Sequence, residues 1–507
     1  MEVFHNLLYG FSVALSPANF LYCLLGVFIG TLVGVLPGLG VMNAVALLIP
    51  MTFGMNPTAA MIMLSGIYYG AMYGGSTTAI LINTPGEAPA IMTTLDGYQM
   101  ALQGRAGPAL GIAAFGSFIA GTFATVMLMI LAEPLVKVAL SFGPTEYFSM
   151  LILALCTLGG LMGESVIKGL LMAAFGIFLG TVGIDPVSGV DRFTFGIPDF
   201  MDGIGFLPVA IGLFAIAEVL LTAELEMMRP VVEKVKGLLP SLKDWMDSKW
   251  AIARGTVIGF LIGCMPGGGA TLASVVSYLV EKKVSKHPER FGKGAIEGVA
   301  GPEAANNAAS GGAMVPLLTL GIPSTGVSAV LLGALMLYGL RPGPLLFQKS
   351  PELVWGLIAS LYIGNFLLLL INLPLIGIWV KMLKIPFPLL LPFILVIAIT
   401  GTYATNNSVT EVYVTLIFGV IGYFMKHADL PAAPVIMGIV LGPMLETHFR
   451  RALIISNGAY STFFTHPISA VFLCAAILSI LYPLIRWAIK RRSVTPRARL
   501  EERPKGP

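Results

Sequence analysis

Most of the chain consists of long uncharged runs in which apolar residues predominate. The longest runs cover residues 19–36, 56–82, 106–132, 353–380 and 385–410. Shorter runs cover residues 147–163, 169–184, 203–217, 304–340, 412–425 and 467–485. A helix needs about 20 apolar residues to cross the hydrocarbon core of a bilayer, so this pattern predicts about a dozen transmembrane helices. The run at 304–340 must bend, because Pro316, Gly321 and Pro323 interrupt it.

Charged residues gather in two islands, at 224–254 and 281–293, and in a basic stretch at 486–492. The positive-inside rule places the basic tail in the cytoplasm. Only residues 255–280 separate the two islands, which is enough chain for one crossing. Two topologies are therefore open: either this segment is a re-entrant hairpin, or one of the islands is extracytoplasmic.

The composition agrees with a membrane protein and excludes several other classes. Hydrophobic residues make up 56% of the 507 residues, charged residues make up only 11%, and the mean hydropathy is +0.87. A soluble domain carries about 25% charged residues. The net charge of +4 is too small for a surface that binds nucleic acid, and the four scattered cysteines indicate neither a disulfide framework nor a zinc site. The predicted fold class is an all-α polytopic integral membrane protein, with the first apolar segment retained as a span.

The sequence also repeats itself over a long distance. Residues 26–40 read GVFIGTLVGVLPGLG and residues 255–269 read GTVIGFLIGCMPGGG, with six Gly or Pro positions in common at a shift of 229. We interpret the chain as two related transmembrane halves, residues 1–225 and 255–507, joined by a charged linker at 226–254. Two-fold repeats with interrupted helices are typical of secondary transporters. Whether the repeats are inverted or parallel depends on the open question of sidedness, and we favour inverted repeats.

The first candidate site residues lie at two helix breaks, PGLG at 37–40 and PGGG at 266–269. Proline removes a backbone donor and glycine tolerates a positive φ, so each break ends one helix and allows another to begin. A helix that begins there directs free N–H groups and the positive end of its dipole toward an anion. A tight surface turn is the alternative. The candidates at these breaks are Gly38, Gly40, Asn43, Gly267, Gly268, Gly269 and Thr271.

Two further breaks combine helix-breaking residues with hydroxyl and amide groups. A single Ser or Thr on a membrane helix usually bonds to its own backbone, so the clustering is what indicates substrate or ion binding. The candidates here are Ser76, Thr77, Asn83, Thr84, Pro85, Gly86, Pro323, Ser324 and Thr325.

A polar pair, Asn306 and Asn307, lies in an apolar helical run, where such residues are costly unless they are paired. The alternative to a binding role is hydrogen bonding between helices, and for the nearby Glu303 it is an interfacial helix cap. The glycine ladders at 26, 30 and 34 and at 255, 259 and 263 are best interpreted as faces for close helix packing.

Enzyme signatures are missing from the sequence. It contains no GxxxxGK[ST] motif for ATP hydrolysis, and its five histidines form no HExxH pattern. We therefore expect that the protein is not an enzyme and that it needs no cofactor or metal.

Four motifs together carry a family resemblance. They are GVLPGLG at 34–40, YGGSTTAILINTPGEAPA at 73–90, GCMPGGGA at 263–270 and GVAGPEAANNAASGGAMVPLLTLGIPSTG at 298–326. With these motifs, its length and its duplication, the chain resembles the large membrane subunit of tripartite tricarboxylate transporters, the TctA family, over nearly its whole length. Typical members read GIPG where this chain has GIPS, which leaves this break with less backbone freedom.

The resemblance implies a permease of the bacterial cytoplasmic (inner) membrane. It would work with a small four-helix membrane subunit and a periplasmic solute-binding protein. Uptake of a di- or tricarboxylate would be coupled to a gradient of H⁺ or Na⁺ and not to ATP. The helix N-termini at the breaks would then meet the carboxylates, while the neutral polar candidates supply hydrogen bonds or cation ligands. The alternative function is a non-transporting membrane receptor or assembly scaffold.

Overall fold

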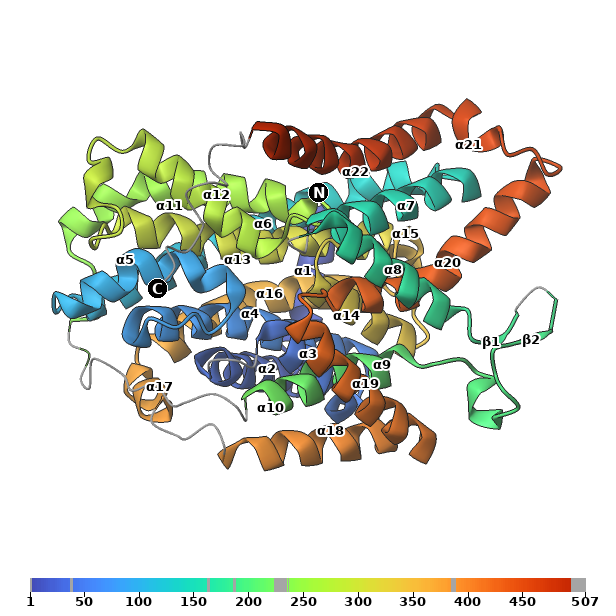
Figure 1. Ribbon diagram of the computed structural model, residues 1–507. Helices are drawn as coiled ribbons and strands as arrows, with labels where there is room; N and C mark the ends of the chain where they lie inside the picture. The colour runs from blue at the N-terminus through green and yellow to red at the C-terminus, as the bar shows by residue number, and fades with distance from the viewer. Residues whose placement is uncertain are drawn as a thin grey trace, which may run out of the picture.

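The computed structural model describes residues 2–36, 40–161, 165–185, 188–222, 235, 237–383 and 389–493. Within these ranges the chain is helical apart from loops and one antiparallel pair of two-residue strands, β1 (Gly183–Ile184) and β2 (Asp191–Arg192) (Figure 1). The helices of the first half are α1 Glu2–Ala14, α2 Pro17–Val35, α3 Val41–Leu48, α4 Pro57–Ile82, α5 Ile91–Leu102, α6 Ala106–Leu140, α7 Pro144–Leu161, α8 Val166–Gly180, α9 Phe206–Ala210 and α10 Ala217–Thr222. Those of the second half are α11 Leu242–Cys264, α12 Gly269–Val284, α13 Glu297–Leu320, α14 Gly326–Leu337, α15 Pro344–Lys349, α16 Pro351–Asn372, α17 Ile376–Met382, α18 Leu391–Asn406, α19 Val409–His427, α20 Ala433–Ile455, α21 Thr462–Thr465 and α22 Pro467–Ser493.

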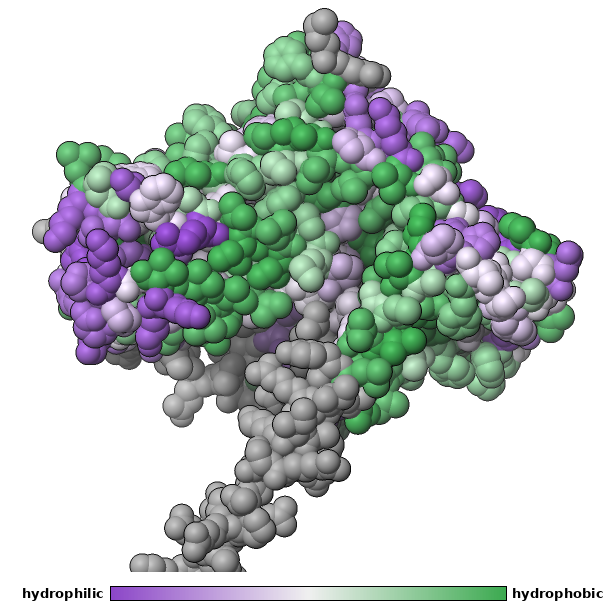
Figure 2. Space-filling view, turned by 90° about the horizontal axis from the view of Figure 1, so that it is seen from above, coloured by the Kyte–Doolittle hydropathy of each residue, from purple (hydrophilic) through white to green (hydrophobic). Residues whose placement is uncertain are grey.

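Several of these helices suit a membrane. In the described chain α2, α6, α16 and α19 are each long and apolar enough to cross one, and shorter apolar helices accompany them. Seen from above, hydrophilic residues gather toward opposite ends of the molecule and hydrophobic residues cover the surface between them (Figure 2). The prediction of an all-α protein with several apolar helices is confirmed, while the number of about a dozen crossings stays a prediction.

The glycine ladders hold two pairs of helices unusually close. α2 packs along α4, and α11 packs along α13 in the same manner. A Cβ on Gly30 would lie 2.4 Å from the carbonyl oxygen of Ile67, and a Cβ on Gly259 would lie 2.1 Å from that of Ala305. Only glycine allows these approaches, as in the small-residue faces of membrane helices. The other ladder contacts are of the same kind: Gly26 with Met63, Gly34 with Ala71, Gly255 with Gly301, and Gly263 with Ala309.

The chain turns back on itself after α11. Arg254 of α11 donates two hydrogen bonds, of 2.7 and 2.6 Å, to the carboxylate of Glu281 near the end of α12. A Cβ on Gly301, near the start of α13, would lie 3.0 Å from the Glu281 side chain. The end of α12 therefore lies beside the middle of α11, and α11 and α12 form a helical hairpin. This arrangement is compatible with a re-entrant hairpin, and the sidedness of the two charged islands stays a prediction.

α4 and α13 pass each other in opposite directions at the centre of the molecule. The Tyr69 hydroxyl on α4 would lie 3.0 Å from a Cβ on Gly311, whereas Ser76, further along α4, bonds to Glu303, which is earlier in α13. Because α2 runs with α4 and α11 runs with α13, the two pairs of helices point in opposite directions.

Polar contacts fix the loop before α13, which lies at the same end of the molecule as the hairpin of α11 and α12. Asp96 of α5 is fully buried and accepts hydrogen bonds of 2.8–2.9 Å from the backbone N–H groups of Gly292, Gly294 and Ala295. The hydroxyl of Tyr278 on α12 donates another at 2.9 Å. One carboxylate thereby ties α5, α12 and the loop together.

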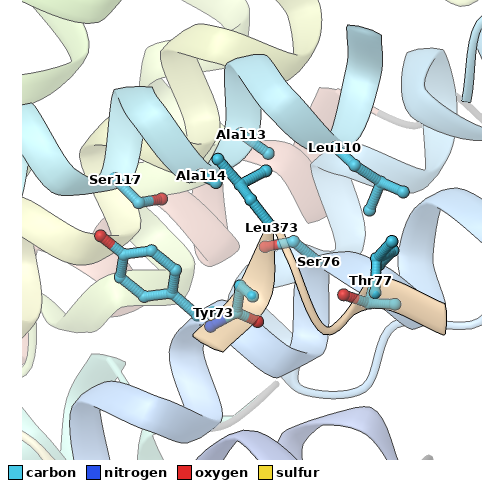
Figure 3. A pocket seen from close by; sticks show the side chains of 10 residues that line it. Tyr73, Ser76, Thr77, Leu110, Ala113, Ala114, Ser117 and Leu373 are labelled. Carbon is cyan, nitrogen blue, oxygen red and sulfur yellow. The ribbon is translucent and has the colours of Figure 1, made fainter. Parts of the chain in front are cut away.

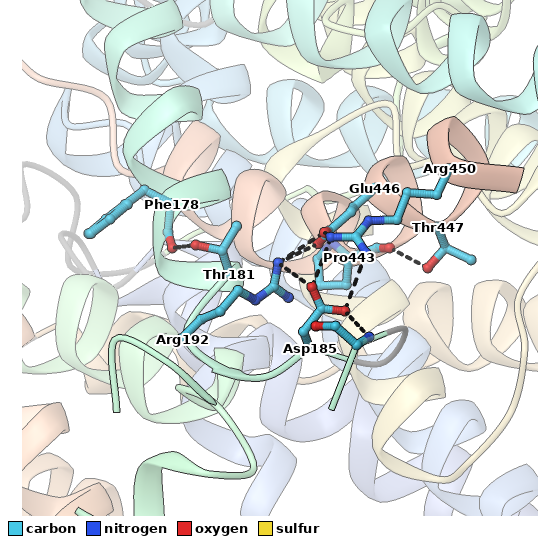
Figure 4. Close-up of polar contacts among 9 residues, drawn as sticks. Phe178, Thr181, Asp185, Arg192, Pro443, Glu446, Thr447 and Arg450 are labelled. Atoms are coloured by element: carbon cyan, nitrogen blue, oxygen red, sulfur yellow. Dashed lines mark hydrogen bonds and ion pairs between the residues drawn. The ribbon is translucent and has the colours of Figure 1, made fainter. Parts of the chain in front are cut away.

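Ion pairs attach the β-strand pair to α20 at the opposite end of the molecule (Figures 1 and 4). The guanidinium of Arg450 binds Asp185 at 2.8 Å and Glu446 at 2.6 Å, and Arg192 of β2 binds Glu446 at 2.9 Å. Each arginine contacts both acids. These pairs hold the strands against α20.

Candidate functional site

A buried carboxylate is the centre of a polar network between the two halves of the chain. Glu303 of α13 is fully buried. One of its oxygens accepts hydrogen bonds from Ser76 Oγ of α4 at 2.6 Å and from Asn306 Nδ2 at 3.1 Å. The other accepts one from the hydroxyl of Thr93 on α5. The alternative that Glu303 caps a helix at the membrane interface is wrong, because its side chain lies inside the protein.

The network continues to α6 and to a small cavity. Asn307 Nδ2 donates to Ser117 Oγ on α6 at 2.7 Å and also to the side-chain oxygen of Asn306. Ser76, Thr77 and Ser117 line a cavity of about 20 Å³ between α4, α6 and the end of α16 (Figure 3). A cavity of this size holds about one water molecule. The sequence candidates Ser76, Thr77, Asn306 and Asn307 are therefore brought together, with Glu303 and Ser117 as the residues that connect them.

A second buried carboxyl, Glu87, lies close to Glu303. After α4 ends, the chain folds back along the helix, so that a Cβ on Gly75 would lie only 2.6 Å from Glu87 Cγ. Gly86 fits against the carbonyl oxygen of Gly34 on α2, where a Cβ would lie at 2.2 Å. Neither carboxyl oxygen of Glu87 has a hydrogen-bond partner in the described part of the chain. Glu87 and Thr93 are not among the residues predicted from the sequence. The only sequence signal for Glu87 is its position directly after the predicted helix break at Pro85 and Gly86.

Helices begin after the predicted breaks, and several of their N-termini converge. α12 begins at Gly269 and α14 at Gly326, and the N–H of Gly267 donates to the carbonyl of Ser324 at 3.0 Å. A Cβ on Gly326 would lie 2.5 Å from Met42 Sδ on α3 and 3.1 Å from the Cβ of Ala433 on α20. The starts of α3, α12, α14 and α20 therefore meet.

Several of the residues predicted at the breaks lie at this meeting point. Gly40, Gly267 and Gly269 adopt positive φ angles of 62°, 78° and 63°, as the break hypothesis requires. Thr325 caps α14, and the hydroxyl of the fully buried Ser324 has no partner among the described residues. Gly38 lies outside the described residues. The remaining residues of these motifs, Gly268 and Pro323, are buried beside them.

Some candidates lie apart from both groups. Asn83 ends α4 in a left-handed conformation with φ of 56°, and its side chain is exposed, as is that of Thr271 on α12. Thr84 and Pro85 are half-buried beside Asn83. Asn43 reaches toward Glu218 of α10 at 3.5 Å, and Lys426 binds the same oxygen of Glu218. In this conformation the structure does not bring these residues into the central network.

A larger cavity of about 490 Å³ lies between the loop before α9 and the facing ends of α18 and α19. Its charged lining residues are Asp199, Asp202 and Glu411. The hydroxyls of Thr410 and Ser408 hold the pKa of Asp199 below its usual range. An acidic lining of this kind repels carboxylates, so this cavity does not suit an organic anion.

Comparison with known proteins identifies the family. Residues 20–437 match the tripartite tricarboxylate transporter TctA family. An Agrobacterium vitis protein described as "Uncharacterized 52.8 kDa protein in TAR-I ttuC' 3'region" is 49% identical over 96% of this chain and 97% of its own length. A second, "Uncharacterized protein in TAR-II ttuC' 3'region" of the same organism, is 50% identical over 45% of this chain and 94% of its own length. No solved structure matches the chain. The match over most of the chain shows that this multi-pass membrane protein belongs to the TctA family of tripartite tricarboxylate transporters.

Proposed function

We propose that the protein is the permease subunit of a binding-protein-dependent secondary active transporter that takes up organic carboxylates, driven by a cation gradient. A small membrane subunit and a periplasmic solute-binding protein would complete the system in the bacterial inner membrane. Membership of the TctA family supports the class of function. The substrate class is supported further by the geometry of the helix N-termini, and coupling to a cation gradient is what the resemblance to the family implies.

The convergence of helix N-termini is the observation that carries this proposal. Free N–H groups and the positive dipole ends of helices favour negative charge, and half-helices in transporters use them to bind substrate carboxylates. The starts of α12 and α14 meet beside the unpartnered hydroxyl of Ser324. A carboxylate bound there would accept hydrogen bonds without a buried Lys or Arg, which is costly in a membrane.

The antiparallel arrangement of α4 and α13 supports inverted repeats. Inverted repeats place equivalent halves in opposite orientations around a central site, which suits alternating access. We propose that residues 1–225 and 255–507 are these halves, with the breaks at 37–40 and 266–269 in equivalent positions. The same glycine spacing and the same close contacts in the two ladders support this assignment.

Reconstitution tests the proposed function. Proteoliposomes that contain both membrane subunits are supplied with the binding protein and radiolabelled citrate, and uptake is measured with a pH gradient or a Na⁺ gradient imposed alone. Ser324→Ala removes the unpartnered hydroxyl and is expected to raise the substrate concentration needed for half-maximal uptake, while Thr271→Ala, on an exposed face, serves as the matched control. If a panel of di- and tricarboxylates gave no gradient-driven flux, the scaffold alternative would replace this proposal.

A further inference from the structure

We propose that Glu87 is the side chain that binds and releases the coupling proton, with Glu303 as its hydrogen-bonded acidic neighbour. This inference rests on the proposed function and assigns the cation-coupling step to a particular residue. Both carboxyls contact the same turn of α4, because Glu87 lies against Gly75 and Glu303 accepts a hydrogen bond from Ser76. Their surroundings differ in a way that separates their roles.

Hydrogen-bond donors surround the carboxyl of Glu303. Its carboxylate accepts hydrogen bonds from two hydroxyls and one amide, those of Ser76, Thr93 and Asn306. Hydrogen bonds that end on a charged oxygen are about twice as strong as neutral ones, and three of them replace much of the lost hydration. These donors support the charged form of Glu303.

Glu87 has no such support. Only 5% of its surface is exposed. No hydrogen bond or ion pair of the described chain reaches either carboxyl oxygen. An isolated carboxylate is very unfavourable in such an environment, and the group avoids the cost by binding a proton. A negative charge on Glu303 would oppose ionisation of Glu87 further. Glu87 is therefore neutral in this conformation and carries one exchangeable proton.

Independent features of the same region point to a hydrated path. The side-chain oxygen of Asn307 is fully buried and has no partner within the described residues. The cavity of about 20 Å³ is lined by Ser76 and Ser117, the hydroxyls that bond to Glu303 and to Asn307. A single water there would lie beside Ser76, whose hydroxyl donates to Glu303.

The other titratable groups of the described chain near Glu87 lie on the helices packed around it. On α4 they are the buried tyrosines Tyr68, Tyr69 and Tyr73. Two acids are engaged, Asp96 of α5 by three backbone N–H groups and Tyr278, and Glu281 of α12 by Arg254. Glu297, in the first turn of α13, also has one buried oxygen without a partner, but its side chain is only half-buried, so water can solvate its charge better than that of Glu87.

The proton explains how a carboxylate can bind near two acids. In the outward-facing state one proton from the periplasm adds to the Glu87 carboxylate, which removes one negative charge and the repulsion that goes with it. When the site opens to the cytoplasm, water reaches Glu87 and the proton leaves as hydronium. The restored charge then favours release of the substrate anion.

Infrared spectroscopy tests the protonation state without any substrate. Purified protein in lipid is titrated from acid to alkaline pH, and the carbonyl-stretch band of protonated carboxyls is recorded. At neutral pH the wild type, Glu303→Gln and the exposed-loop control Glu289→Gln are expected to show a band that Glu87→Gln lacks. A band of full intensity in Glu87→Gln would overturn the inference. Glu87→Asp keeps the acid and is expected to restore the band, which guards against a misfolded variant.

Transport then tests the coupling. Proteoliposomes with both membrane subunits, the binding protein and radiolabelled citrate are compared under an imposed pH gradient and in exchange without a gradient. One proton per substrate gives about tenfold accumulation for each pH unit, so Glu87→Gln is expected to exchange citrate but to lose this accumulation. Accumulation driven by a pH gradient in Glu87→Gln, or by Na⁺ alone in the wild type, refutes the assignment. If the wild type moves no carboxylate at all, the proposed function fails, while the infrared result still decides the state of Glu87.

Discussion

Substitution of a ladder glycine tests whether backbone contact holds the helix pairs together. In Gly259→Ala the new methyl group would lie 2.1 Å from the carbonyl oxygen of Ala305, more than 1 Å inside ordinary van der Waals contact. The neighbour is backbone and cannot rotate away, so α11 and α13 must separate along their length. Gly377 of α17 provides a matched control, because a Cβ there meets nothing within 4 Å.

The expected change in the free energy of unfolding follows from two opposing effects. Overpacking of a close contact costs about 1–3 kcal/mol. Alanine has the better helix propensity, which returns about 1 kcal/mol in a helix interior. For Gly259→Ala the clash with the backbone places the cost at the upper end, so we expect a net destabilisation of about 1–2 kcal/mol. For Gly377→Ala only the propensity remains, so the sign reverses and the protein gains up to about 1 kcal/mol.

Thermal unfolding in detergent, followed by circular dichroism, measures both effects under identical conditions. Gly30→Ala, which meets the carbonyl of Ile67 in the other ladder, is expected to behave like Gly259→Ala. An unfolding temperature of Gly259→Ala equal to or above that of Gly377→Ala would refute the reasoning. Such a result would mean that the helix pair can separate without loss of packing.

Three further predictions concern charged and capping residues. Arg254→Ala leaves the carboxylate of Glu281, which is 3% exposed, without its partner. We expect the free energy of unfolding to fall by about 2–4 kcal/mol, measured by thermal unfolding. Addition of Glu281→Gln should recover part of this loss, because it removes the unpaired buried charge. Asp96→Asn replaces an acceptor of three backbone hydrogen bonds by a weaker one, so hydrogen exchange in the loop before α13 should accelerate, and unchanged protection would contradict the assignment. Ser408→Ala removes a donor that lowers the pKa of Asp199. The pKa of Asp199 should therefore rise in an NMR titration. In the wild type, the ionised Asp199 stabilises the fold above the ordinary pKa of an aspartate, about 3.9. This stabilisation is lost as the pH falls through the lower pKa that Asp199 has in the folded protein.

The pattern of residues was sufficient for the helical class and for the packing of the ladders. Long apolar runs with few charges can satisfy their backbone in a membrane only as helices, so the class follows from composition and run length. Glycines spaced four apart lie on one face of a helix, so Gly26, Gly30 and Gly34 predict a close contact before the partner helix is known. Proline and glycine at the breaks likewise predict where α3, α12 and α14 begin.

Whether an individual side chain is buried in the site or exposed depends on the rotation of its helix and on the path of the loops. Thr271 and Asn83 have the chemistry of ligands, yet both are exposed. Glu303 can be taken for an interfacial cap from its sequence context, but α13 continues past it on both sides and buries it. The return of the chain along α4 puts Glu87 beside Gly75, and no local pattern predicts that contact.

The sequence by itself determined that this protein is an all-α membrane protein with paired glycine faces and interrupted helices. These properties depend on spacing along one chain segment, which the residue order states directly. Only the tertiary structure decided that α11 and α12 form a hairpin, that α4 and α13 are antiparallel, and that Glu303 is buried among neutral donors while the nearby Glu87 has none among the described residues. Those are contacts between segments distant in sequence, and they depend on how whole helices pack and where their loops return.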